Sequence, residues 1–474
     1  MSSDTDRHAL LRAVLRTDLS SFIHKSVGTV DPGCAYQHNW HIDAIAHALE
    51  EVATRKTRRL VITMPPRSLK SISASVAFPA WLLGRNPRMN ILAVSYAEAL
   101  AEKLALDCLK IIEAPWYRDI FPRTCIAKGR GARSDFATTL GGGRYSTSVG
   151  GALTGRGGDI ILIDDPHKPE DAASEVKRKS VLEWYRSTLL SRLNDPINSP
   201  IVLIQQRVHE EDLAGFLLEQ GDWQHLDLPA IAEDEATIDL GKRGTLTRAE
   251  GALLHPERLP MNLLEQRRSE LGSYVFAAQY QQRPAPLDGG IVKWSWFKAY
   301  DQLPTRQPED RIVQSWDTAS KADEANDYSV CTTWLVRDTM AWLMHIYRAR
   351  LEFPDLRRKI DQLAKQHGAK HVLIEEAGSG VQLIQDLRRH SSFGAIGIVP
   401  KDDKATRLLG VSHLIEAGNI AVPQDAPWLA DFQREITLFP NRKHDDQVDS
   451  LSQFLGWLAQ PPRRAWEVEI EGFY

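Results

Sequence analysis

The chain has 474 residues, too many for one ordinary domain of roughly 100–200 residues, so two or three structural units are expected. Hydrophobic residues make up 43% of the chain and charged residues 25%, a globular composition that excludes a disordered or fibrous protein. The formal net charge of −4, from 58 basic and 62 acidic residues, excludes a protein that holds nucleic acid by bulk positive charge, so any such contact needs a local basic patch.

The sequence predicts a protein without membrane or secretory segments. No stretch approaches the roughly 18 uninterrupted apolar residues of a membrane span. The first residues lack the basic start and apolar block of a secretory signal. The four cysteines, Cys34, Cys108, Cys125 and Cys331, are far apart, which argues against a disulfide framework or a zinc site. A reducing, cytoplasmic setting is therefore expected.

The first part of the chain alternates short apolar strands with helices. Strands are predicted at 59–64, 90–95, 159–164 and 200–205, and helices at 71–83 and 97–112. The strands are nearly continuous runs of apolar residues, which is typical of a parallel sheet covered on both faces. We therefore predict an α/β fold for this part.

The segment Met64-Pro-Pro-Arg-Ser-Leu-Lys-Ser71 joins the first strand to the next helix, where a phosphate-binding loop belongs. Lys70 supplies an ammonium group for the β- and γ-phosphates, and Ser71 supplies a hydroxyl for Mg²⁺. The usual motif has glycines where this chain has Met64 and Leu69. This segment alone leaves two alternatives open, a P-loop or a proline-rich turn with a solvated lysine.

The strand at 159–164 ends in two carboxylates, Asp164 and Asp165, in a Walker B arrangement. Asp164 is predicted to hold Mg²⁺ through water, and Asp165 to orient or deprotonate the attacking water. The alternative is a strand end capped by two aspartates. Because the two motifs come in order, each at the C-terminal end of a strand, we favour ATP binding and hydrolysis.

Further segments of this half resemble the packaging ATPase of tailed-phage terminase large subunits. They are Gln37, Trp40-His41, Gly155-Arg156-Gly157 and the run IVLIQQRVHEEDLAG at 201–215. The resemblance implies that Gln37 lies near the adenine, that Arg67 acts on the γ-phosphate, and that Gln206 and Arg207 couple hydrolysis to movement. The implied nucleotide-binding residues are Gln37, Pro66, Arg67, Ser68, Leu69, Lys70, Ser71 and Asp164. A salt bridge on the loop rim is an equal alternative for Arg67, and Trp40 is expected to be a core aromatic.

A proline- and glycine-rich stretch at 283–290 marks the expected domain boundary. We expect an ATPase domain over 1–282, in which the polar segment 233–260 is a linker subdomain or a long loop. A linker at 283–295, a second domain at 296–460 and a flexible tail at 461–474 follow.

The second part opens with three strands, at 311–317, 328–336 and 340–349, joined by short loops and expected to be antiparallel. Alternating helices and strands follow, at 354–366, 371–375, 381–389, 396–399 and 404–417, before a last helix at 446–458. The order βββαβαβα predicts a ribonuclease-H-like fold with a mixed sheet.

Carboxylates fall at three places in that order. Asp317 ends the first strand and Glu375 ends the fourth, while Asp446 and Asp449 share one face at the start of the last helix. Side chains so placed can converge on two Mg²⁺ or Mn²⁺ ions about 4 Å apart, one activating water and the other stabilising the leaving 3′ oxygen. Oxygen-only ligands favour these cations over zinc.

Several neighbouring residues stay open as alternatives. Glu376 is the alternative to Glu375, and Asp445 is predicted to cap the last helix rather than to bind metal. Asp327 is either a residue behind the ligands or an ordinary loop aspartate. His444 either assists the site or is structural.

These carboxylates also resemble the terminase nuclease domain, so the resemblance covers about residues 35–460. It implies ATP-driven translocation of double-stranded DNA into a viral procapsid and endonucleolytic cutting of concatemeric DNA, in the cytoplasm of a bacterial host. The implied partners are a portal protein, the procapsid and a small terminase subunit. The implied assembly is a monomer in solution and a ring, commonly of five copies, on the portal. A repair or restriction ATPase-nuclease and a non-hydrolysing docking subunit stay open as alternatives.

The end of the chain combines aromatic and acidic residues. Arg463-Arg464 are followed by Trp466, three glutamates, Phe473 and Tyr474. This pattern favours docking to a basic partner surface, for which the resemblance implies the portal or procapsid. A disordered end is the alternative.

Overall fold

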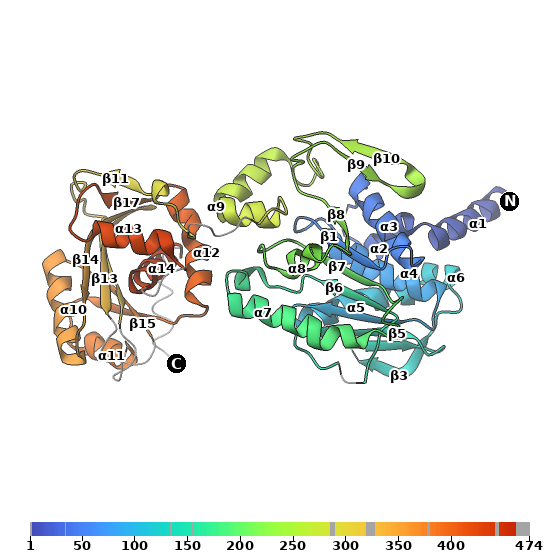
Figure 1. Ribbon diagram of the computed structural model, residues 1–474, viewed down its shortest axis with the longest axis horizontal. Coiled ribbons are helices and arrows are strands. Elements are labelled where there is room, and N and C mark those ends of the chain that lie inside the picture. Colours follow the sequence, from blue (N-terminus) through green and yellow to red (C-terminus); the bar gives the residue numbers. More distant parts are fainter. Residues whose placement is uncertain are drawn as a thin grey trace. The chain divides into compact units, whose positions relative to one another are not determined.

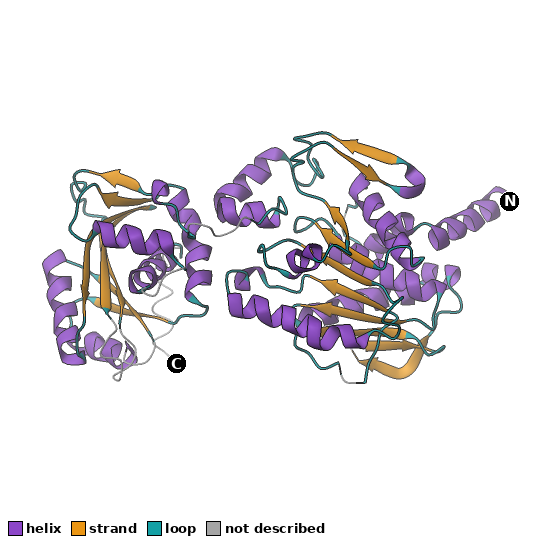
Figure 2. Cartoon of the chain, viewed as in Figure 1, coloured by secondary structure: helices purple, strands orange, loops and turns teal. Residues whose placement is uncertain are grey.

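The computed structural model describes residues 2–33, 35–132, 135–153, 155–284, 290–318, 328–376, 380–440 and 445–460. Two compact units make up the chain. The first comprises Met1–Arg268 and Ser273–Pro286, and the second comprises Ser269–Gly272 and Leu287–Tyr474. Each unit has its own β-sheet with helices packed against it (Figures 1 and 2). None of the helices in the described ranges combines the length and hydrophobicity that spanning a bilayer requires.

The first unit contains an eight-stranded sheet in the order β3-β4-β5-β2-β6-β7-β1-β8. The six strands from β5 to β8 in that order run parallel, which confirms the predicted parallel sheet. The parallel strands β5 and β8 and the antiparallel strands β3 and β4 were not predicted. The strands are β1 (Arg59–Thr63), β2 (Asn90–Ser95), β3 (Ile126–Ala132), β4 (Asp135–Thr138), β5 (Gly143–Ser148), β6 (Ile160–Asp164), β7 (Ile201–Gln205) and β8 (Gln224–Asp227).

Helices cover both faces of this sheet because successive apolar residues of each strand point to opposite sides. In β6, Ile160 and Leu162 belong to one hydrophobic cluster, and Ile161 and Ile163 belong to another. Trp40 packs against the first cluster, as predicted for a core aromatic. The helices are α1 (Ser2–Thr17), α2 (Leu19–Val30), α3 (Trp40–Ala53), α4 (Phe78–Arg85), α5 (Glu98–Glu113), α6 (Pro115–Ile120), α7 (Glu175–Trp184) and α8 (Leu213–Glu219). Helix α9 (Met261–Gln279) is kinked at Gly272, and its residues Ser269–Gly272 belong to the second unit.

Two segments of the first unit differ in detail from the predicted elements. The helix expected at 71–83 begins as a π-helical segment, Ile72–Ala77, that runs into α4. Within the polar segment 233–260, strands β9 (Ala236–Asp239) and β10 (Thr245–Arg248) form an antiparallel pair.

The second unit contains a seven-stranded mixed sheet in the order β11-β17-β14-β13-β12-β15-β16. Strands β12, β13 and β14 are antiparallel and β12, β15 and β16 are parallel, which confirms the predicted mixed sheet. The strands are β11 (Lys298–Tyr300), β12 (Arg311–Asp317), β13 (Ser329–Arg337), β14 (Met340–Ala349), β15 (His371–Glu375), β16 (Gly394–Ile398) and β17 (Ile420–Pro423). The short strands β11 and β17 were not predicted, because three or four residues carry no periodic signal.

Among the described residues of the second unit, five helices flank the sheet. Helices α10 and α11 share one hydrophobic cluster with β12 and β15. Helix α14 packs against β12 and β13, where Phe454 stacks on Trp334 with ring centroids 4.3 Å apart. The helices are α10 (Phe353–His367), α11 (Gly380–His390), α12 (Lys404–Glu416), α13 (Leu429–Leu438) and α14 (Asp446–Leu458). Helix α13 is an addition to the predicted order.

Candidate nucleotide and nuclease sites

The two predicted nucleotide motifs meet at one edge of the first sheet. Strands β1 and β7 end side by side, with Thr63 opposite Gln205, and Asp164 at the end of β6 pairs with Ile204 of β7. Because these strands are parallel, the segments that follow their C-terminal ends emerge at the same edge. Residues 64–71 and the Asp164-Asp165 pair are two of these segments.

Two direct contacts join the loop to the aspartates. The Lys70 Nζ lies 2.9 Å from Asp165 Oδ2. The Ser71 hydroxyl donates to Asp164 Oδ1 at 3.1 Å. The Lys70 side chain is only 8% exposed, which is incompatible with the alternative of a solvated lysine in a turn. The structure thus places four predicted nucleotide-site residues in contact.

The loop backbone takes left-handed conformations without glycine. Leu69 has φ = 63° and Arg67 has φ = 62°, and Asp165 in the facing motif has φ = 42°. Left-handed backbone costs a residue with a Cβ about 1–2 kcal/mol. Leu69, which stands where the usual motif has glycine, therefore adopts a conformation that favours glycine while packing its side chain against the first hydrophobic cluster.

Unpaired polar atoms gather at the same edge. Asp164 Oδ2, both side-chain polar atoms of Gln205, and Gln206 Oε1 are buried without a hydrogen-bond partner among the described residues. Buried polar atoms are normally paired. Burial, with the neighbouring Asp165, raises the pKa of Asp164. A divalent cation offsets both costs, so the oxygen donors of Asp164 and Ser71 fit Mg²⁺.

The predicted coupling residues touch the second aspartate and the start of α8. The Gln206 backbone N–H donates to Asp165 Oδ1 at 2.9 Å. Arg207 is buried, and its Nε lies 3.0 Å from both carboxylate oxygens of Asp212, whose side chain caps α8. The Arg207 backbone N–H donates to Gln282 at 2.9 Å. This segment therefore links Asp165 to an element outside the nucleotide site.

Gln37 and Arg67 have exposed side chains, and neither makes a hydrogen bond or ion pair within the described residues. The rim salt bridge weighed for Arg67 therefore does not form there. Sequence analysis missed the contact of His41, whose buried ring lies against the backbone of Ser68. Burial, with the nearby His255, lowers the pKa of His41 to about 3, so its ring is neutral.

In the second unit, strand register brings two predicted carboxylates together. Trp316 of β12 pairs with Ile374 of the parallel strand β15, so Asp317 and Glu375 end adjacent strands. Helix α14 is fixed to β12 because Ser450 and Ser315 each donate a side-chain hydrogen bond, of 2.8 Å, to the carbonyl of the other. The first turn of α14, with Asp446 and Asp449, is thereby held at the same end of the sheet.

Electrostatics shows that these carboxylates interact. Burial raises the pKa of Asp317 well above its usual range, and the charges of Asp449, Glu375 and Asp446 add to this. Burial also raises the pKa of Asp449 to about 6, although Lys404 opposes the shift. When all of these carboxylates are ionised, they carry more negative charge than the surrounding protein groups stabilise.

Sequence analysis missed three cations that bind these carboxylates. Lys404 Nζ lies 2.5 Å from Asp449 Oδ2 and 2.6 Å from Asp445 Oδ1. Arg407 lies 2.7 Å from Asp449 and 3.4 Å from Glu375, and Arg348 of β14 lies 3.1 Å from Asp446. Lys404 and Arg407 are three residues apart on α12, so their shared helix face was the one available signal.

The prediction that Asp445 caps the last helix needs correction. Asp445 directly precedes α14, but its side chain makes no capping hydrogen bond and accepts from Lys404 instead. Glu435, which was not predicted, accepts from the Gln447 backbone N–H at 2.6 Å and takes over this role. Glu376 is exposed while Glu375 is paired with Arg407. Asp327, His444 and the tail 461–474 lie outside the described residues.

The predicted carboxylate ligands have the oxygen atoms that suit a hard divalent cation, although several of them contact positively charged side chains of the protein instead. Over the described ranges, no three acidic, histidine or cysteine side chains already surround one point as metal ligands do. Lys404, Arg407 and Arg348 draw the carboxylates toward themselves. Carboxylate oxygens are the ligands that Mg²⁺ and Mn²⁺ prefer, so the chemistry of Asp317, Glu375, Asp446 and Asp449 fits these ions.

The two sheets and their sites define a class of protein, in which a P-loop ATPase fold is followed by a ribonuclease-H-like fold. Residues 314–456 match the family model described as the terminase RNaseH-like domain. The terminase large subunit of Enterobacteria phage T3 is 24% identical over 368 residues, which cover 70% of this chain but only 60% of that protein.

Solved structures of the large terminase from the thermophilic bacteriophage D6E share the fold. One has a TM-score of 0.52 and 10% identity, and another, in complex with ADP, has a TM-score of 0.50 and 12% identity. Each comparison covers 86% of this chain and 98% of that chain. The present chain is therefore similar to the phage terminase large subunits, which confirms the predicted resemblance.

Proposed function

We propose that this chain hydrolyses ATP to move double-stranded DNA into a viral procapsid and cuts concatemeric DNA with its second domain. The observation that carries the proposal is the meeting of Lys70 and Ser71 with Asp165 and Asp164 at one sheet edge. The convergence of Asp317 with three further carboxylates supports the nuclease activity. The relationship to phage large terminases supplies the biological setting.

In the ATPase site, Lys70 binds the β- and γ-phosphates. Ser71 and Asp164 hold Mg²⁺, which neutralises phosphate charge when bound. Phosphate oxygens compete with Asp165 for the Lys70 ammonium, which frees Asp165 to orient the attacking water. Gln206, whose backbone N–H contacts Asp165, passes this change toward Arg207 and α8.

The remaining nucleotide contacts belong to the rim of the site. Pro66, Ser68 and Leu69 shape the loop around the phosphates. The exposed Arg67 contacts the γ-phosphate with its guanidinium group, and the exposed Gln37 contacts the adenine.

In the nuclease site, Asp317, Glu375, Asp446 and Asp449 hold two Mg²⁺ or Mn²⁺ ions, which supply an activated water and stabilise the leaving oxygen when bound. Lys404 and Arg407 give up their carboxylate contacts and then face the DNA phosphates. Because phosphate contacts carry no base information, little sequence preference is expected.

The proposed partners are a portal protein, the procapsid and a small terminase subunit in the cytoplasm of a bacterial host. The chain is a monomer in solution and forms a ring, possibly of five copies as in the family, only on the portal. The proposed domain limits are 1–282, with 233–260 as a linker subdomain, and 296–460 after a linker at 283–295. The tail 461–474 docks on the portal or procapsid.

DNA-stimulated ATP hydrolysis by the purified chain tests the proposal. We expect turnover that rises when duplex DNA is added and metal-dependent cutting of that DNA. A chain that binds DNA without hydrolysing ATP is instead a docking subunit. Packaging of DNA into procapsids, measured as DNase-protected DNA, distinguishes a terminase from a repair or restriction enzyme.

A further inference from the structure

A basic pocket lies at the edge of the first sheet opposite the nucleotide site. Its volume is 720 Å³, and it is lined by the first residues of β1 and β8, Arg59 and Gln224. The nucleotide motifs follow the other ends of the parallel strands, at Thr63 and Asp164. We use the name basic pocket for Lys56, Arg58, Arg59, Tyr185, Arg186 and Phe216, which all line it.

The arginines of the basic pocket are held by uncharged groups. Arg58 donates to the Ile197 carbonyl at 3.2 Å, and Arg59 donates to the carbonyls of Arg58 and Ser199 at 2.9 and 3.0 Å. The Arg186 guanidinium lies 4.3 Å from the centre of the Phe216 ring. Within the described residues, none of these arginines forms an ion pair with a carboxylate.

The remaining charges do not neutralise the pocket. Lys56 pairs with Glu51 at 2.9 Å, and Asp222 is the one acidic residue among those that line the pocket. Burial lowers the pKa of Arg59, and Arg58 adds to this effect. Burial and the neighbouring Arg58 both disfavour the charged form of Arg59, and an anion in the pocket offsets both effects.

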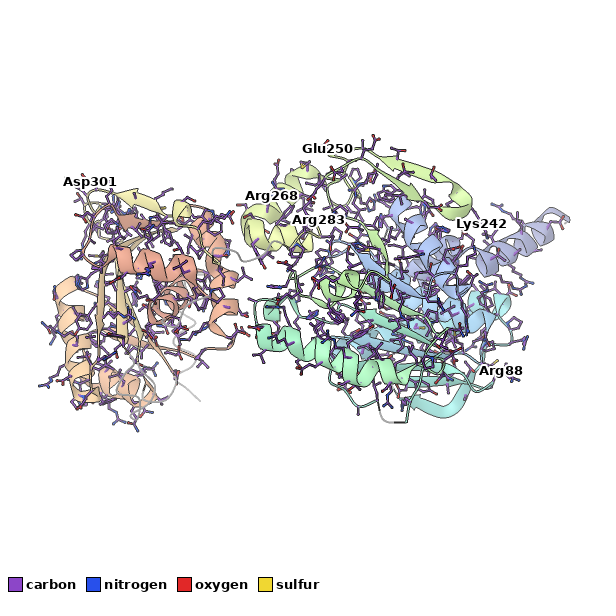
Figure 3. All side chains as sticks on the ribbon, in the orientation of Figure 1. Arg88, Lys242, Glu250, Arg268, Arg283 and Asp301 are labelled. Carbon is purple, nitrogen blue, oxygen red and sulfur yellow. The ribbon has the colours of Figure 1, made fainter. Side chains whose placement is uncertain are left out.

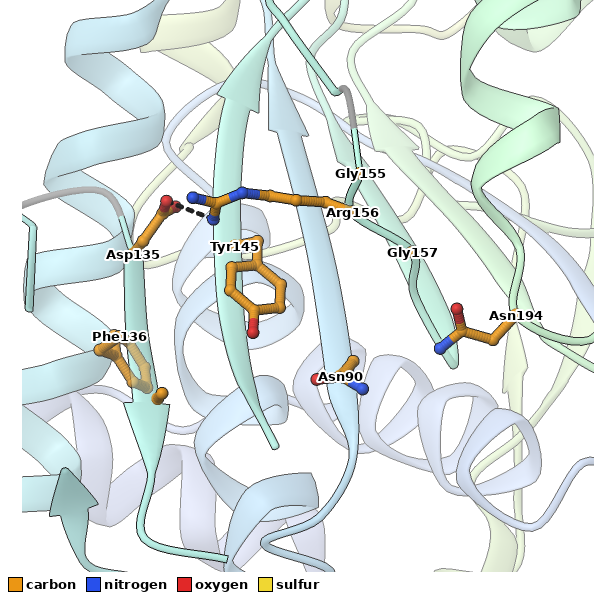
Figure 4. Close-up of a pocket in the computed structure, with 9 residues that line it drawn as sticks. Asn90, Asp135, Phe136, Tyr145, Gly155, Arg156, Gly157 and Asn194 are labelled. Carbon is orange, nitrogen blue, oxygen red and sulfur yellow. Dashed lines mark hydrogen bonds and ion pairs between the residues drawn. The ribbon is translucent and has the colours of Figure 1, made fainter. Parts of the chain in front are cut away.

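In a second pocket of the same unit, the arginine is paired with a carboxylate (Figure 4). It has a volume of 520 Å³, and its arginine, Arg156, reaches across Tyr145 to form an ion pair with Asp135. There a carboxylate of the protein already balances the cation. The two pockets therefore differ in whether a carboxylate of the protein pairs with the arginines that line them.

We propose that the basic pocket binds phosphate groups of the double-stranded DNA backbone, as a DNA contact separate from the nuclease site. This inference rests on the proposed function, which supplies the DNA. Guanidinium groups bind phosphate oxygens through paired N–H donors, and contacts to carbonyls and to the Phe216 ring position these groups in advance. The pocket is a local basic patch of the kind that a chain of net charge −4 needs for DNA.

The position of the pocket connects DNA to the nucleotide. Strand β1 begins at Arg59 and ends at Thr63, immediately before the loop that carries Lys70. A force on DNA phosphates held at Arg58 and Arg59 therefore acts on the strand that leads into the loop. We therefore also expect DNA bound in the pocket to stimulate ATP hydrolysis.

The test compares two double variants of the full chain with the same change in charge. One is Arg58→Glu with Arg186→Glu, and its matched control is Arg88→Glu with Lys242→Glu, at exposed positions outside the pocket (Figure 3). Binding of a fluorescent mixed-sequence duplex is measured by anisotropy in EDTA over a series of salt concentrations. ADP binding and circular dichroism report the integrity of the fold.

We expect the pocket variant to bind duplex about 10-fold or more weakly, with a salt slope lower by about 1–2, and to lose DNA stimulation of ATP hydrolysis. Its basal ATPase activity, ADP binding and circular dichroism should match those of the control. Equal DNA binding by both variants overturns the pocket assignment, and so does an equal loss in both. If the unmodified chain does not bind duplex at all, the proposed function itself fails.

Free nucleotide is the other source of phosphate, and ADP stoichiometry distinguishes it. One ADP bound per chain in both the unmodified protein and the pocket variant supports DNA as the ligand. A second bound ADP that only the pocket variant loses overturns the assignment to DNA.

Discussion

Lys70 Nζ lies 2.9 Å from Asp165 Oδ2, so the loop lysine and the second aspartate of the facing motif form an ion pair. The two side chains are 8% and 18% exposed. In such a setting each charge depends on the other, because an unpaired buried charge is costly. Under the proposed function, a nucleotide that attracts Lys70 also releases Asp165, so we expect the two residues to respond to ATP together.

Replacing Lys70 tests the loop directly. Lys70→Ala removes the ammonium that binds the β- and γ-phosphates, so we expect ATP turnover to fall at least about 100-fold. Metal-dependent DNA cutting by the same protein should persist, since its residues lie in the other unit. The exposed Lys168→Ala is the control. Turnover of Lys70→Ala at the unmodified rate contradicts the P-loop assignment.

Asp165 is expected to act in hydrolysis rather than in binding. Asp165→Asn keeps the side chain's size but removes the charge that orients water, so ATP should bind while turnover falls by about 100-fold or more. Fluorescent-nucleotide titration and phosphate release measure the two properties separately. If nucleotide binding is lost instead, Asp165 has a structural or metal-holding role.

Leu69 offers a test of backbone conformation. Leu69→Gly relieves about 1–2 kcal/mol of left-handed strain at φ = 63° but loses the side chain's packing. We expect a small net change in thermal stability and retained ATP turnover. Leu69→Val, whose β-branched side chain tolerates positive φ least, should lose both stability and turnover. Equal behaviour of the two variants contradicts the strained-loop interpretation.

Asp317 is the expected centre of the nuclease site, because the other three carboxylates all act on its pKa. Asp317→Ala should abolish Mn²⁺-dependent cutting of duplex DNA while leaving DNA-independent ATP hydrolysis unchanged. The exposed Asp301→Ala serves as control (Figure 3). Cutting at the unmodified rate by Asp317→Ala means that the two-metal assignment is wrong.

The pH dependence of metal-free stability follows from Asp449. Its pKa is raised to about 6 in the folded protein, so between about pH 4 and pH 6 the folded state binds more protons than the unfolded state. The stability contributed by this group is therefore lost as pH rises through 6. The melting temperature in EDTA should fall over this range more steeply than that of Asp449→Asn.

Metal reverses this trend, because a divalent cation favours the ionised carboxylates. The rise in melting temperature on adding Mn²⁺ should consequently be larger at pH 7.5 than at pH 5. A Mn²⁺ effect of equal size at both pH values, or none in the unmodified chain, contradicts a metal site at these carboxylates.

Much of the fold was predictable because its signals are local. The apolar runs at 159–164 and 200–205 correspond to the buried strands β6 and β7 of the structure. Strands β12, β13 and β14 of the second unit carry similarly strong patterns. Strands β3, β4, β5 and β8 of the first sheet and β11 and β17 of the second escaped prediction, because their formation depends on neighbouring strands rather than on their own residues.

The sequence by itself identified the candidate site residues, since Asp164, Asp317 and Glu375 end strands that apolar runs reveal and Lys70 lies in the loop that follows another such strand. Only the tertiary structure decided what each of them contacts. Lys404 reaches Asp449, and Glu435 rather than Asp445 caps α14. Arg58 and Arg186 line one pocket although they are far apart in sequence. Such partnerships depend on strand register and helix packing, which bring distant segments together, and no local pattern encodes them.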